Sequence, residues 1–139
     1  MIELTNNTSL QINKEFLNDI ASFLSKKDIE LYIVDKEEML RINQEQRAVT
    51  KETDVLSFPY EEMPMAPLGS IVICDAFVYS KSQELKHSQN DEFALLFIHG
   101  MLHLIGFDHE TDDGEMRSKE NELIAKFHLP KSLIVRAQG

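Results

Sequence analysis

From residue 97 to residue 109 the chain reads Phe97-Ile98-His99-Gly100-Met101-Leu102-His103-Leu104-Ile105-Gly106-Phe107-Asp108-His109. Three of the chain's five histidines fall in this stretch, at offsets of four and then six residues. Residues four apart on a helix share one face, with Cβ atoms about 6 Å apart, so two imidazoles there can converge on one ion. The stretch therefore predicts a helix that carries a metal site.

The residues around these histidines predict where the helix ends. Residues 91–105 are apolar and unbroken enough to form a helix. Gly106 is the residue expected just past its end, because glycine adopts a left-handed turn at little cost. Such a turn would bring His109 back towards His99 and His103. Three neutral imidazoles with no fourth ligand nearby in sequence resemble an open zinc site that holds a water molecule.

The competing interpretation is structural. A histidine on an apolar helix is usually a satisfied core or surface residue, and a bare His-x-x-x-His pair is a weak signal. The third histidine makes the metal site the favoured interpretation.

Other polar residues have less specific signals. Among the nearby acids Asp54, Asp108 and Glu110, we expect Asp108 to orient a ligand imidazole or to cap the turn rather than to act as a base. Arg47 has the planar guanidinium that pairs with phosphate. From the residues alone, however, a solvated surface arginine is the better interpretation of Arg47.

The size and composition of the chain predict one domain over residues 1–139. The single cysteine, Cys74, lies in an apolar run, which excludes an intramolecular disulfide framework and predicts a small buried strand residue in a reducing compartment. The N-terminus has no signal-peptide pattern, and no apolar run approaches the roughly 20 residues of a membrane span. We therefore expect a cytoplasmic protein without membrane contact.

The net charge is −10, from 14 basic and 24 acidic residues. No polybasic tract is present in the sequence. This charge argues against non-specific nucleic-acid binding, including binding to DNA. A polyanionic substrate would need a local positive cleft.

Strand patterns concentrate in the first half of the chain and helical patterns in the second. We expect strands at 2–5, 29–34, 53–58 and 68–74, the last two of which are expected to pair. Helices are expected after the cap Asn13, after the capping-box pair Asp35 and Glu38, and at about 75–86, 91–105 and 116–127. In the first helix, the expected core face comprises Phe16, Leu17, Ile20, Phe23 and Leu24. The predicted fold class is α+β, a small mixed sheet of about four strands covered by about five helices.

The histidine spacing is similar to that of metzincin proteases, but one position differs. Those proteases carry a glutamate directly after the first histidine as general base, whereas this chain has Gly100. The sequence thus lacks the peptidase base.

The histidine stretch, taken together with two upstream segments, resembles the YbeY family of bacterial rRNA-maturation endoribonucleases over most of the chain. The segments are Thr53-Asp54-Val55-Leu56-Ser57-Phe58-Pro59 and Leu68-Gly69. The resemblance implies that His99, His103 and His109 bind one zinc ion and that the enzyme acts in rRNA processing and ribosome quality control. It also implies ribosomal proteins or assembly factors as partners. Arg47 lies where the family carries a functional arginine.

Three positions depart from the family pattern. Ser70 replaces the usual aspartate after Leu-Gly, Phe107 replaces a tyrosine, and Glu52 replaces the proline before Thr53. None of these changes removes a metal ligand.

The working hypothesis is a zinc-dependent, single-strand-specific endoribonuclease in which Arg47 positions phosphate charge. Two alternatives stay open. One is a metallohydrolase of another class, a peptidase or a phosphoesterase. The other is a non-catalytic, zinc-containing ribosome-assembly factor.

Overall fold

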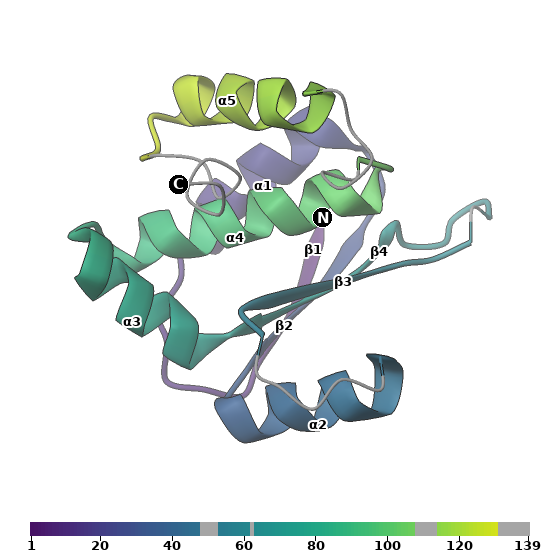
Figure 1. Ribbon diagram of the computed structural model, residues 1–139. Coiled ribbons are helices and arrows are strands. Elements are labelled where there is room, and N and C mark those ends of the chain that lie inside the picture. The colour runs from purple at the N-terminus through teal and green to yellow at the C-terminus, as the bar shows by residue number, and fades with distance from the viewer. Residues whose placement is uncertain (48–52, 62, 108–113, 131–139) are drawn as a thin grey trace.

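The computed structural model describes residues 1–47, 53–61, 63–107 and 114–130. Its strands are β1 (Ile2–Asn6), β2 (Ile29–Val34), β3 (Val55–Pro59) and β4 (Gly69–Cys74). Its helices are α1 (Lys14–Leu24), α2 (Lys36–Arg47), α3 (Asp75–Leu85), α4 (Gln89–Leu104) and α5 (Glu115–Phe127). The predicted α+β class is confirmed, and so is a mixed sheet of four strands with five helices (Figure 1).

The strands lie in the order β1-β2-β4-β3. β1, β2 and β4 run parallel, whereas β3 runs antiparallel to β4, with Val55 opposite Ile73 and Pro59 opposite Gly69. The expected pairing of the third and fourth strands is therefore confirmed. In the described sheet β3 is an edge strand, and its position matters for the site because α4 packs across it.

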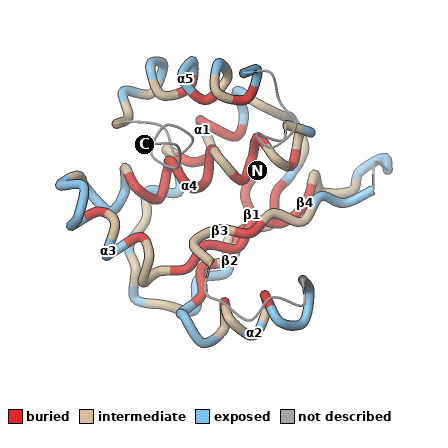
Figure 2. The backbone as a smooth tube through the Cα atoms, in the orientation of Figure 1, coloured by how far each residue is buried: buried red, intermediate tan, exposed pale blue. Residues whose placement is uncertain are grey.

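Helices cover the sheet unequally. α1, α4 and α5 lie on one side and α2 lies on the other (Figure 1). α4 contacts β3, β4, α1, α3 and α5. Eleven of its 16 residues are buried, as the red trace in Figure 2 illustrates. A helix that is apolar nearly all round belongs in the interior, so α4 is the central helix of the fold.

Both ends of α4 follow from local chemistry. The helix begins after Ser88, whose hydroxyl oxygen accepts a hydrogen bond from the Asp91 N–H at 3.0 Å. It ends before Gly106, which has φ of 106°, a conformation that glycine adopts without steric cost. The predicted turn at Gly106 is confirmed, and the helix starts two residues earlier than the sequence pattern predicted.

α1 confirms the predicted cap and most of the predicted core face. Asn13 accepts from the Phe16 N–H, and Leu17 and Ile20 are buried. The prediction for Phe23 is wrong, because 42% of this side chain is exposed. Its ring instead lies edge-on to Phe127 of α5, with the ring centroids 6.3 Å apart.

The opposite face of the sheet has its own small core. The carboxylate of Asp35 caps α2 by accepting from the Glu38 N–H at 2.9 Å, while the Glu38 carboxylate pairs with Arg41. A second group of buried apolar residues lies beneath α2: Val34, Met39, Leu56, Val72 and Cys74. Cys74 is fully buried at the end of β4, as predicted. Within the described ranges, no helix combines the length and apolarity needed to cross a membrane.

Candidate metal centre

Two of the three predicted ligands converge. His99 and His103 lie one turn apart on α4, with their Nε2 atoms 3.2 Å apart and their rings at 81°. Two nitrogens that each lie about 2.1 Å from a tetrahedral zinc ion are roughly 3.4 Å apart. The imidazole pair therefore has nearly the spacing that a shared ion requires.

The turn after α4 orients the second imidazole. Nδ1 of His103 lies 2.9 Å from the carbonyl oxygen of Phe107. A carbonyl only accepts, so this nitrogen carries the proton and Nε2 keeps its lone pair. The positive φ of Gly106 turns the chain so that Phe107 returns to the helix end. The glycine predicted from the sequence thus has a specific use, because its turn brings the Phe107 carbonyl to Nδ1 of His103.

A carboxylate from another helix approaches the first imidazole. Oε2 of Glu120 in α5 lies 3.5 Å from Nδ1 of His99, and only 1% of Glu120 is exposed. Carboxylates on the far nitrogen of a ligand histidine fix the ring and raise its basicity. From the sequence, Asp108 was expected to orient a ligand imidazole, but Asp108 lies outside the described residues, and Glu120 was not predicted.

A usable signal for Glu120 was present in the sequence. Met116, Glu120 and Leu123 are spaced four and three apart, which places all three on one helix face. All three are buried. A glutamate in the middle of an apolar face is rarely left without a charged or polar partner in the interior. Its position indicated a functional or pairing role.

Gly100 is required by close packing. A Cβ atom at this position would lie 3.0 Å from Cγ2 of Ile71 and 3.1 Å from Oγ of Ser57. The Ser57 hydroxyl donates to the Gly100 carbonyl at 3.1 Å, which holds α4 against β3. The position directly after His99 therefore faces the sheet. It has no room for the glutamate that the protease pattern would place there.

The remaining predicted residues are only partly placed. His109, Asp108 and Glu110 lie outside the described residues. Arg47 is the last residue of α2, and its side chain is likewise outside them. Asp54 accepts a hydrogen bond from the Val55 N–H at 2.8 Å. Within the described ranges no group of three or more His, Cys, Asp or Glu side chains could hold a metal ion, so the three-histidine set stays a prediction.

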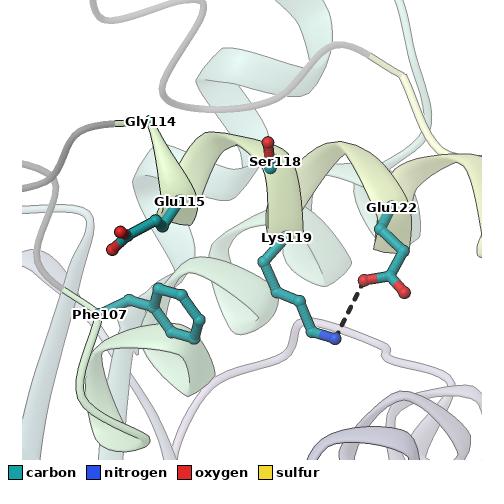
Figure 3. Close-up of a pocket in the computed structure, with 6 residues that line it drawn as sticks. All are labelled: Phe107, Gly114, Glu115, Ser118, Lys119 and Glu122. Carbon is teal, nitrogen blue, oxygen red and sulfur yellow. Dashed lines mark ion pairs between the residues drawn. The ribbon is translucent and has the colours of Figure 1, made fainter.

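An open depression lies beside the turn that orients His103 (Figure 3). Its lining comes from the turn and from the start of α5: Phe107, Gly114, Glu115, Ser118, Lys119 and Glu122. Lys119 points along it but pairs with Glu122 at 2.9 Å. The lining carries both signs of charge, so this depression is not a strongly positive phosphate site by itself.

Fold and site together define a small α+β protein with an imidazole pair spaced for a metal ion on its central helix. A family model described as "Endoribonuclease YbeY" matches residues 2–128. The chain therefore belongs to the endoribonuclease YbeY family, as its sequence motifs indicated.

Curated relatives named "Endoribonuclease YbeY" match along nearly their whole length. The protein of Sulfurimonas denitrificans is 58% identical over 139 residues, covering 100% of both chains. That of Aliarcobacter butzleri is 56% identical over 138 residues, covering 98% of this chain and 99% of the relative. The solution structure of a Thermotoga maritima protein is similar with a TM-score of 0.64 at 27% identity, covering 91% of this chain and 89% of that one.

Proposed function

We propose that this protein is a zinc-dependent endoribonuclease that cuts single-stranded ribosomal RNA during rRNA maturation and ribosome quality control. The observation that carries the proposal is the convergence of the His99 and His103 Nε2 atoms at 3.2 Å in a chain that belongs to the endoribonuclease YbeY family. The names of the full-length relatives support the reaction class.

His99, His103 and His109 would hold one Zn²⁺ ion in this single domain. When bound, zinc acts as a Lewis acid towards a phosphoryl oxygen and lowers the pKa of its water to near 7. The protein's own contribution is orientation. The Phe107 carbonyl fixes the tautomer of His103, and Glu120 lies against the far nitrogen of His99.

Arg47 is proposed to bind the phosphate that flanks the scissile bond. Its guanidinium is always charged and presents a planar fork to two phosphate oxygens. Such a residue is needed because the net charge of −10 repels RNA at long range. We propose that ribosomal proteins or assembly factors deliver the rRNA and offset this repulsion.

A peptidase is the less supported alternative. Its general base would follow the first histidine, where Gly100 packs against Ile71 and Ser57. The same packing does not argue against a phosphodiester substrate, because none of the residues proposed to hold the metal or the phosphate lies at this position.

The test is cleavage of a single-stranded rRNA fragment by wild type, His103→Ala and Arg47→Ala, each checked for native circular dichroism. We expect no cleavage by His103→Ala, and at least tenfold slower cleavage by Arg47→Ala. Two variants outside the site serve as controls. His128→Asn changes an exposed histidine after α5, and Arg41→Ala changes an arginine within α2.

Equal cleavage by folded wild type and folded, metal-free His103→Ala would contradict the proposal. Activity of the pure wild type on peptides, with none on rRNA, would favour the alternative hydrolase. A wild type that binds zinc and never cuts RNA would favour a non-catalytic assembly factor.

A further inference from the structure

β3 is an edge strand, so only one side of its backbone forms hydrogen bonds to β4. The Cys74 N–H donates to the Asp54 carbonyl at 2.9 Å, and the Tyr60 N–H donates to the Leu68 carbonyl at 3.1 Å. In an antiparallel pair, alternate residues bond to the partner strand and the others point away from it. The even-numbered residues 54 to 60 therefore bond β4, and Val55, Ser57 and Pro59 present their backbone groups outward.

Two of these three outward positions offer no donor. The Val55 N–H already donates to the Asp54 carboxylate at 2.8 Å. Pro59 has no N–H. Ser57 is left in the middle, and no described group accepts from its N–H. Along this edge Ser57 alone, within the part of the chain that the structure describes, presents a donor and an acceptor side by side.

This backbone pair belongs to a residue that contacts α4 one position after His99. The Ser57 hydroxyl donates to the Gly100 carbonyl at 3.1 Å, and Gly100 directly follows His99. β3 and α4 contact each other, and α4 lies above β3 in Figure 1. A substrate whose phosphate reaches His99 and His103 therefore passes close to the outer edge at Ser57.

We propose that the backbone N–H and carbonyl of Ser57 form a nucleobase subsite that binds the Watson–Crick edge of an unpaired base beside the scissile phosphate. This inference rests on the proposed function. Every RNA base carries a neighbouring acceptor and donor on that edge, and the edge is accessible only in unpaired RNA. The subsite thus accepts any base and rejects a paired one, which accounts for single-strand selectivity without reading sequence.

A protein strand is a poorer fit for this edge. Addition of a peptide strand requires backbone pairs at successive alternate residues. Here the neighbouring positions are closed, because Asp54 occupies the N–H of Val55 and Pro59 has none. Proline and a capped N–H are devices that protect an edge strand from pairing. The single exposed N–H and carbonyl of Ser57 therefore suit one planar base better than a peptide strand.

The test compares substitutions that together separate the Ser57 N–H from the Ser57 hydroxyl. Ser57→Pro removes the outward N–H together with the hydroxyl, and it removes no bond to β4. Ser57→Ala keeps that N–H and removes only the hydroxyl that donates to Gly100. Val55→Pro places a proline at the neighbouring outward position, whose N–H is already taken by Asp54. Binding of each zinc-loaded variant to a short unstructured oligoribonucleotide is measured, next to the same oligonucleotide with an abasic site at the cleavage position.

We expect Ser57→Pro to bind the intact oligonucleotide about tenfold more weakly, the effect of one lost hydrogen bond of roughly 1.4 kcal/mol. Its affinity for the abasic oligonucleotide should match that of wild type. Ser57→Ala and Val55→Pro should stay within about twofold of wild type on both. An unchanged affinity of Ser57→Pro, or an equal loss in Ser57→Ala, would overturn the subsite.

A second measurement does not depend on the folding of any variant. With wild type, methylation of the base on its Watson–Crick edge should weaken binding, and methylation on its Hoogsteen edge should not. Equal affinities would overturn the proposal. If Ser57→Pro lost affinity for an alternating Val-Thr peptide and not for RNA, the edge would be a protein-docking strand. If the wild type cuts no RNA, the proposed function itself is rejected. If the wild type cuts RNA but the affinity differences between variants and between methylated oligonucleotides are absent, only the subsite is rejected.

Discussion

Glu120 is the residue whose role the structure adds to the site. It lies on α5, 21 positions after His99, and reaches that imidazole only because α5 packs against α4. The sequence could predict the pair His99 and His103, because one helical turn fixes their spacing. It could not predict which acid from another helix would meet them, since that contact depends on tertiary packing.

Glu120→Gln should weaken zinc binding and leave the fold intact. The amide keeps the volume of the side chain but removes the charge beside Nδ1 of His99, and loss of such a partner costs about 10- to 100-fold in metal affinity. Competition with a chelator of known affinity measures the change. Glu122→Gln is the matched control on the same helix, since Glu122 is exposed and pairs with Lys119. If Glu120→Gln bound zinc with wild-type affinity, Glu120 would have only a packing role.

The hydroxyls of Tyr32 and Tyr60 both donate to the carboxylate of Glu30. The Tyr60 hydroxyl donates to Glu30 at 2.6 Å, and this hydrogen bond raises the pKa of Tyr60. Burial, followed by the charge of Glu30, raises the pKa of Tyr32. A raised phenol pKa means that the folded state favours the neutral form. The stability that these groups contribute is thus present below the ordinary tyrosine pKa and is lost as the pH rises through the folded-state values.

Glu30→Gln should lower both tyrosine pKa values, because an amide does not repel a phenolate. Phenolate absorbance during an alkaline titration reports the change, and it should appear at lower pH in the variant than in wild type. Superimposable titration curves for the two proteins would show that Glu30 does not control these phenols.

At the scale of elements, α4 shows how far sequence reasoning reaches. Apolar composition and Gly106 predicted the helix and its end, whereas a buried helix has no polar face from which periodicity could fix its start. The true start depends on Ser88, whose hydroxyl caps the helix by accepting from the Asp91 N–H. In α1, by contrast, the apolar spacing overestimated the core, because Phe23 lies at the margin of the packed face.

Ser88→Ala should destabilise the protein by about 1 kcal/mol, since the Asp91 N–H loses its acceptor at the start of α4. Urea denaturation measures the free energy of unfolding. Ser80→Ala is the control, because Ser80 is exposed within α3 and alanine is at least as good a helix former there. Equal stability of wild type and Ser88→Ala would contradict the assigned cap.

For the whole molecule, the fold class was predictable and the strand order was not. Local patterns located all four strands and the β3–β4 pairing, which joins segments close in sequence. The parallel pairing of β2 with β4 joins segments 40 residues apart, as Ile29 opposite Gly69 shows, and no local pattern encodes it. That pairing places β3 at the edge of the sheet, where it contacts α4.

His99, His103 and His109 are proposed to hold one zinc ion together, and metal analysis of the purified protein tests this three-histidine set. Wild type, His103→Ala and His109→Ala are expressed with zinc, desalted and measured for metal per chain, with circular dichroism confirming the fold of each. We expect about one zinc per chain in wild type and almost none in either folded variant. A metal-free wild type, or a folded His103→Ala protein that retains a full equivalent of zinc, would contradict it.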